Sequence, residues 1–224
     1  MVTLLHPPYT AWHLSYVAIG AALAPTFMLW RLGAAIGAFF LALGIGCHAL
    51  DELAGRPLGT RLPSAALIGL AALGLAGAVA IGAVGAIVVS VWLIPFMVAG
   101  VVLALGYNLE LFGGRLHTDL WFALAWGGFP ALTGWFVEAL RIRPEGLLVA
   151  LACCLLSLAQ RRLSTPAREL RRRTTSVEGR QTLRDGRIIE LDTARLAAPL
   201  EGALSVLWMA MVVLAVALVL ARLR

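Results

Sequence analysis

Carboxylates, histidines and arginines gather in two short stretches of an otherwise apolar sequence. The first stretch contains His48, Asp51 and Glu52, and spacings of three and four residues place these side chains on one face of a helix. A charged group at the centre of a bilayer costs about 2.5–3.5 kcal/mol, so the ionisable groups that a membrane protein keeps are candidates for function. The second stretch carries Asn108, Glu110, Arg115, His117 and Asp119.

These residue types suit a metal ion and a phosphate group. Carboxylate oxygens suit Mg²⁺, which binds through one or two carboxylates and substrate phosphates. Imidazole nitrogens equally suit Zn²⁺ or another transition metal. The candidate metal ligands are His48, Asp51, Glu52, His117 and Asp119. The guanidinium groups of Arg56, Arg61 and Arg115 can hold phosphate oxygens through paired hydrogen bonds. An amphiphile with a diphosphate head and an apolar tail would fit such a site.

The elements that must position these residues are membrane helices. The chain has 224 residues, of which 61% are apolar and 13% charged, with a mean hydropathy of +0.90. Soluble domains carry about 25% charged residues, and a bilayer core takes about 20 apolar residues per helix. We expect an all-α polytopic bundle of about seven spans, or six if 65–107 divides differently. The expected spans are 11–30, 33–53, 65–83, 86–107, 119–138, 145–160 and 203–222.

The sequence divides into a bundle of six spans (1–160), an arginine-rich segment (161–200) and a last span (201–224). Ser164-Thr165-Pro166 predicts the start of a short basic helix. Asp185-Gly186 predicts a β-hairpin with a two-residue type I′ turn. Because an isolated hairpin is marginally stable in water, we expect it to pack on the inner face of the bundle.

The distribution of arginine predicts the orientation in the membrane. All 18 basic residues are arginine, and thirteen of them fall inside when the loop after the second span is placed in the cytoplasm. Because basic loops stay in the cytoplasm, we expect a multi-pass cell-membrane protein with a cytoplasmic N-terminus and an external C-terminus. Both polar stretches then face the cytoplasm. Pro25, Pro95 and Pro130 fall inside predicted spans, where kinks would open space for a lipid.

The residues from Cys47 to Glu52, followed by Arg56-Pro57, resemble the first aspartate-rich motif of the UbiA-type intramembrane prenyltransferases. That motif reads Asn-Asp-x-x-Asp-x-x-x-Asp, precedes an Arg-Pro segment and follows the second helix on the cytoplasmic side. Residues 107–115 and 126–135 are similar to the fourth-to-fifth helix region of the family. The resemblance covers about residues 40–136. The second aspartate motif of the family has no counterpart in this shorter chain.

The resemblance implies a UbiA-like fold and transfer of a prenyl group from an isoprenyl diphosphate to an apolar acceptor. In that case Asp51 and Glu52 would hold Mg²⁺, and Arg56, Arg61 and Arg115 would hold the diphosphate. Tyr107 and Asn108 would shield the allylic cation. The resemblance thus implies that Asp51, Glu52, Tyr107 and Asn108 are the catalytic residues.

Two other functions are compatible with the same residues. One is a metal-dependent membrane enzyme of another kind that uses the His and Asp side chains as ligands. The other is a non-catalytic lipid-binding or accessory protein. The absence of lysine excludes Schiff-base chemistry. We expect no nucleic-acid binding, because the arginine-rich segment lacks interleaved aromatic residues.

Overall fold

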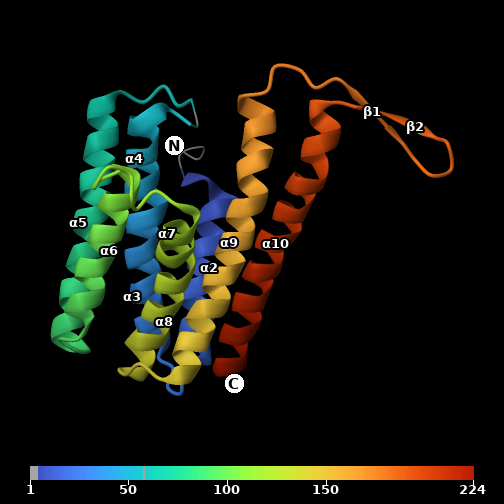
Figure 1. The fold of residues 1–224 in the computed structure, drawn as a ribbon. Helices are drawn as coiled ribbons and strands as arrows, with labels where there is room; N and C mark the ends of the chain where they lie inside the picture. The colour runs from blue at the N-terminus through green and yellow to red at the C-terminus, as the bar shows by residue number, and fades with distance from the viewer. Residues whose placement is uncertain (1–4, 58) are drawn as a thin grey trace.

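The computed structural model describes residues 5–57 and 59–224, and the chain folds there into a bundle of long helices (Figure 1). Helix α2 comprises Pro7–Leu23. The second rod joins α3 (Leu29–Phe39), the π-helix η1 (Phe40–Cys47) and α4 (His48–Gly55). Two helices follow, α5 (Ser64–Val88) and α6 (Leu93–Asn108). The next rod joins α7 (Asp119–Ala123), the π-helix η2 (Leu124–Gly128) and α8 (Phe129–Ala139). The last helices are α9 (Pro144–Arg172) and α10 (Thr193–Arg222).

Five of these rods are long and apolar enough to cross a membrane. They are Leu29–Gly55, Ser64–Val88, Asp119–Ala139, Pro144–Arg172 and Thr193–Arg222. The apolar helix α6 is shorter. Large apolar side chains such as Leu73 and Ile87 stand exposed on the outside of the bundle. Helices that are hydrophobic on every face are typical of membrane spans, so the fold is that of a multi-pass α-helical membrane protein, as the sequence predicts.

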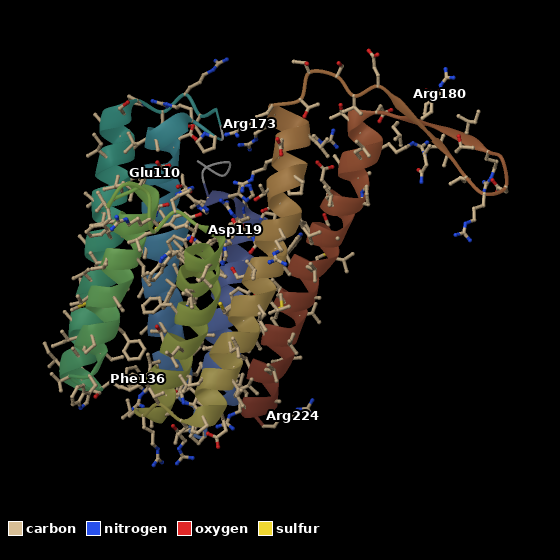
Figure 2. The ribbon with its side chains drawn as sticks, in the orientation of Figure 1. Glu110, Asp119, Phe136, Arg173, Arg180 and Arg224 are labelled. Carbon is tan, nitrogen blue, oxygen red and sulfur yellow. The ribbon has the colours of Figure 1, made fainter. Side chains whose placement is uncertain are left out.

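The bundle has two polar ends, which differ in composition. Figure 2 places Glu110, Asp119 and Arg173 at one end and Phe136 and Arg224 at the other. We name the first the Asp51 end and the second the Arg31 end, after the residues on the second rod. Because α3, η1 and α4 form one continuous rod, Arg31 and Asp51 stand about 30 Å apart at 1.5 Å per residue.

Helix α2 lies in the centre and packs along α8 and α10. Two glycines allow the close contact with α8. A methyl group on Gly20 would meet the carbonyl oxygen of Ala131, and one on Gly134 would meet the carbonyl oxygen of Val17. Small residues at helix interfaces let membrane helices approach closely, and here the two backbones touch.

Several helix boundaries differ from those predicted, and the two that involve Pro25 and Pro166 have a clear physical reason. The predicted span 11–30 ends at Leu23, and Pro25 lies in the break before α3 rather than in a kinked helix. Ala24 is extended, as residues before proline prefer to be. The second difference concerns α9, which continues without a break through Ser164 and Pro166 to Arg172. The predicted start of a separate helix at Ser164 is therefore wrong. Packing of α9 along α10 keeps the helix intact, and Arg171 pairs there with Glu201 at 2.7 Å.

The segment between α9 and α10 forms the predicted hairpin, but with another turn and another position. Strands β1 (Gly179–Thr182) and β2 (Ile188–Leu191) pair antiparallel. The N–H of Leu183 donates to Arg187 O, and only Gly186 in this turn has a positive φ, of 86°. This is a three-residue loop with a bulge, since type I′ needs two residues with positive φ. Hydrogen bonds from Arg187 lower the pKa of Asp185. The hairpin points away from the bundle (Figure 1), so the expected packing is wrong.

We predict that replacing Gly20 or Gly134 by alanine destabilises the bundle by about 1–3 kcal/mol, because the added methyl group separates α2 from α8. Thermal unfolding of the purified protein in detergent measures the effect. Gly69→Ala is the matched control, since nothing lies within 4 Å of a methyl group there. Equal unfolding temperatures for all three variants would contradict the close contact.

Candidate functional site

Part of the two polar stretches converges at the Asp51 end. Asp51 of α4 is within electrostatic range of His117, Arg161 and Arg168. The rings of Tyr107 and His117 stack with centroids 4.4 Å apart, and His117 Nδ1 lies 3.2 Å from Tyr107 O. We call these five residues the Asp51 cluster. It contains one carboxylate and two arginines, and the two arginines come from α9 rather than from the predicted loops.

Asp119 positions one of these arginines. Its Oδ1 accepts a hydrogen bond of 3.0 Å from Arg161 Nε, and the guanidinium carbon lies 5.1 Å from the centre of the Phe122 ring. The Arg161 side chain is largely buried, whereas that of Asp119 is half exposed. Asp119 therefore holds Arg161 from the solvent side, in a position within electrostatic range of Asp51.

Glu52 and Arg56 hold the loop after α4. Glu52 is fully buried, and its Oε1 accepts from the N–H of Thr60 at 2.6 Å and from Thr60 Oγ1 at 2.8 Å. Arg56 has a positive φ of 50° and donates through Nη1 to the carbonyl oxygens of Thr60 and Leu62. In these positions the two side chains bind the protein's own backbone. The predicted roles on a metal and a phosphate would need this loop to open.

Three other predicted residues are not members of the Asp51 cluster, although Asn108 directly follows Tyr107 on α6. Asn108 donates to Ala104 O at 2.6 Å and so satisfies the end of α6. Arg61 and Arg115 are exposed on the loops that precede α5 and α7. The predicted phosphate clamp of Arg56, Arg61 and Arg115 is thus made of one residue that binds the backbone and two that lie on the surface.

The sequence analysis missed a row of rings formed by His6, by Tyr9 and His13 of α2, and by His48 of α4. The His6 ring lies 6.1 Å from that of His48 and 5.3 Å from that of Tyr9, and Tyr9 lies 5.0 Å from His13. His13 is buried and its Nδ1 lies 2.8 Å from Trp126 O. All four histidines of the chain therefore lie at the Asp51 end. Burial lowers the pKa of His6. A histidine within an apolar span is a sequence signal that could have found His13.

A second group of buried polar atoms comes from α9 and from His13. Ser157 and Gln160 of α9 are fully buried, and Ser157 Oγ, both polar side-chain atoms of Gln160 and His13 Nε2 have no hydrogen-bond partner within the described residues. Because buried polar groups are normally satisfied, ordered water is the simplest partner for them. Gln160 is the amide that interrupts the apolar run of α9, which is the signal that the sequence offered.

The metal ligands predicted from the sequence do not assemble as a set. Within residues 5–57 and 59–224, no three histidine, cysteine, aspartate or glutamate side chains come together to hold a metal ion. Glu52 faces Thr60, and Asp119 faces Arg161. His48 lies near His6, with its Nδ1 3.2 Å from Gly44 O. The side chains as placed do not fit a three-ligand centre for Mg²⁺ or Zn²⁺.

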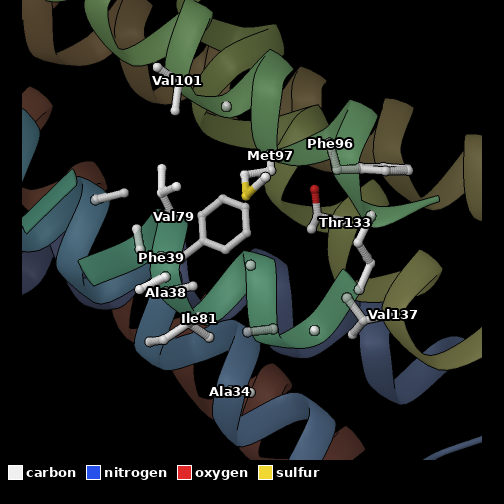
Figure 3. Close-up of a pocket in the computed structure, with 18 of the residues that line it drawn as sticks. Ala34, Ala38, Phe39, Val79, Ile81, Phe96, Met97, Val101, Thr133 and Val137 are labelled. Atoms are coloured by element: carbon white, nitrogen blue, oxygen red, sulfur yellow. The ribbon is translucent and has the colours of Figure 1, made fainter. Parts of the chain in front are cut away.

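A cavity of about 450 Å³ lies between α3, η1, α5, α6, η2 and α8 (Figure 3). Apolar side chains such as Ile81, Met97 and Val101 line it. The Thr133 hydroxyl faces its own helix and donates to Phe129 O at 2.8 Å. Arg31 is the one charged side chain among the described lining residues.

The cavity reaches from the Arg31 end toward the Asp51 cluster. Trp30 and Arg31 line one end, and Ala125 and Trp126 line the other. The Trp126 ring stands edge-to-face with that of Tyr107, with centroids 5.6 Å apart. One aromatic layer therefore separates the cavity from the Asp51 cluster.

No family model, curated protein or solved structure matches this chain. The class that the fold defines is a multi-pass α-helical membrane protein. What this protein binds has to be inferred from its own cavity and polar ends.

We predict that Glu52→Ala destabilises the protein by about 1.5–3 kcal/mol, because Thr60 loses a charged, buried hydrogen-bond partner. The free energy of unfolding, measured without added metal, checks this structural role. Glu110→Ala removes an exposed carboxylate from a neighbouring loop and should leave stability unchanged. If Glu52→Ala unfolds like the wild type, the side chain does not hold the loop.

Proposed function

We propose that this protein binds the apolar chain of a lipid in the cavity between α3, α5, α6 and α8. The observation that carries the proposal is the cavity itself, about 450 Å³ of apolar space inside a membrane bundle. Small-molecule sites occupy roughly 300–1,000 Å³ and are mostly apolar. Protein interiors pack with few voids, so a space of this size is expected to hold a ligand.

Small side chains and two π-helices border the cavity. Ala34, Ala38 and Ala42 repeat every four residues along α3 and η1, and all three line the cavity. The two π-helices η1 and η2 meet its Trp126 end, where both contribute lining residues. Single-turn widening of a helix is frequent at functional sites, because it shifts side chains out of the regular α-helical register.

We propose that α2 and α6 also span the membrane, which brings the number of spans to seven. Helices of 17 and 16 residues are about 25 Å long, and both lie alongside the five longer rods (Figure 1). Thirteen of the 18 arginines lie toward the Asp51 end, which supports a cytoplasmic Asp51 end and N-terminus in the cell membrane.

The rods from 40 to 136, where the sequence resembles UbiA-type enzymes, form much of the cavity wall.

Transfer of a prenyl group, as in UbiA-type enzymes, is a second candidate. The observation that favours it is the position of the Asp51 cluster next to the Trp126 end of the cavity. In this arrangement the prenyl chain and an apolar acceptor would lie in the cavity, and Arg161 and Arg168 would hold the diphosphate. Tyr107 would stand between the diphosphate and the chain. The carboxylates as placed do not form a Mg²⁺ centre, so we assign no role to a metal.

We predict that filling the cavity by Ala38→Trp lowers the amount of lipid that co-purifies several-fold, because the indole occupies the chain's space. Mass spectrometry of lipid extracted from the purified protein measures this amount. Ala72→Trp, on the exposed face of α5, is the matched control and should retain the lipid. A folded Ala38→Trp variant that keeps its full lipid content would refute the proposal.

For the second candidate, we predict prenyl transfer from an isoprenyl diphosphate to an apolar acceptor by the protein in liposomes. Arg161→Gln should lower kcat/KM roughly 10- to 100-fold, because a charged hydrogen bond of about 1.5–3 kcal/mol is lost. Glu110→Gln, on an exposed loop, should leave turnover unchanged. No turnover by a wild-type protein that binds lipid would eliminate the transferase and leave lipid binding as the function.

A further inference from the structure

We infer that the cavity takes an anionic amphiphile whose headgroup sits at Arg31, with its chain extending toward Trp126. This inference rests on the proposed lipid binding and adds the charge of the head and the direction of the chain. It also places the head at the opposite end of the bundle from the Asp51 cluster.

The first argument is the distribution of charge along the cavity wall. Arg31 lines the Arg31 end together with Trp30, and its guanidinium carbon lies 5.5 Å from the centre of the Trp30 ring. The remaining described lining side chains carry no charge. A charged headgroup cannot be buried without a partner, so the Arg31 end is the place in this wall that can receive one.

The second argument is the hydrogen bonding of Arg31. Its Nη1 makes two long contacts, 3.2 Å to Val137 O and 3.4 Å to Glu138 O. Its Nε is buried and has no partner within the described residues, and Arg31 forms no ion pair there. A guanidinium has five donors in a rigid fork that matches carboxylate and phosphate oxygens. Most of that fork is therefore available to an anionic ligand.

The neighbouring carboxylate does not neutralise Arg31 directly. Glu138 is buried, and its Oε2 accepts from the N–H of Met28 at 2.8 Å. Arg222 also acts on Glu138 electrostatically, and its guanidinium lies 5.8 Å from the centre of the Phe27 ring. Arg31 and Arg222 thus both act on this one carboxylate. The local charge favours an anion over a cation.

The third argument is length. The cavity follows the rod from Arg31 to Leu43, which is about 18 Å at 1.5 Å per residue. Beyond Leu43 the wall closes on Ala125 and Trp126, which offer no charged side chain. A single extended chain fits this path with its head at Arg31. The reverse orientation would put the charged head against the aromatic layer of Trp126 and Tyr107.

Binding of hexadecyl phosphate and of hexadecanol, which share one chain, tests the inference with the full-length protein in detergent. We expect the wild type to bind the phosphate at least 10-fold more tightly than the alcohol. Arg31→Gln should lose this preference and still bind hexadecanol. Arg31→Lys should keep a reduced preference, because it retains the charge but not the fork. Arg141→Gln, an exposed arginine at the same end, should behave like the wild type.

The outcomes separate this inference from the proposed function. If the wild type binds both compounds equally, or Arg31→Gln keeps the preference, the head is not at Arg31 although lipid binding stands. If Arg161→Gln abolishes the preference instead, the head lies at the Asp51 cluster. If neither compound binds, lipid binding itself fails.

A photoreactive group at the far end of the hexadecyl phosphate chain gives the direction without any substitution. We expect labelling of η2 near Trp126. Labelling near Trp30 and Val88, which line the opposite end, would overturn the inference.

Discussion

The contact between α2 and α8 is the one on which the rest of the bundle depends. Gly20 and Gly134 bring the two backbones together, so α8 is fixed against the central helix. On one side of this contact His13 reaches Trp126 O in η2. On the other side Thr26 donates to Glu138 O. Both ends of the rod that carries the cavity wall are therefore held by residues in or next to α2.

The cavity exists because the remaining helices do not close to the same distance. Along the middle of α3 and η1, Ala34, Ala38 and Ala42 line the cavity, and α6 on the opposite side contributes the longer side chains of Met97 and Phe96 (Figure 3). The π-helices η1 and η2 shift the side chains out of the regular α-helical register at the Trp126 end of the cavity. Polar groups are sparse inside the bundle and concentrated at its ends, which gives the apolar space a distinct chemistry at each end. Arginine supplies the positive charge at both.

Hydropathy determined the helical class, the positions of most rods and their alternation between the two ends. It did so because about 20 apolar residues in a row can bury themselves only in a membrane. The boundaries at Leu23 and Arg172 were not predictable, since Pro25 breaks a helix and Pro166 does not. Pro166 lies in the helix that packs along α10, whereas Pro25 lies in the break between α2 and α3. The hairpin was predicted from Asp185-Gly186, but its turn type depends on backbone angles that the dipeptide does not fix.

The sequence by itself placed Asp51 and His117 in two stretches of ionisable residues, because charge is rare in spans and therefore conspicuous. Tyr107 was indicated only by the resemblance to UbiA-type enzymes. Only the tertiary structure decided that Glu52 and Arg56 hold a loop, that Arg161 and Arg168 approach Asp51 from α9, and that Arg31 stands alone on the wall of an apolar cavity. The physical reason is that the chemistry of a side chain limits only the kinds of partner that it can bind. Which partner it meets depends on contacts between helices far apart in the chain, and a linear pattern does not record them.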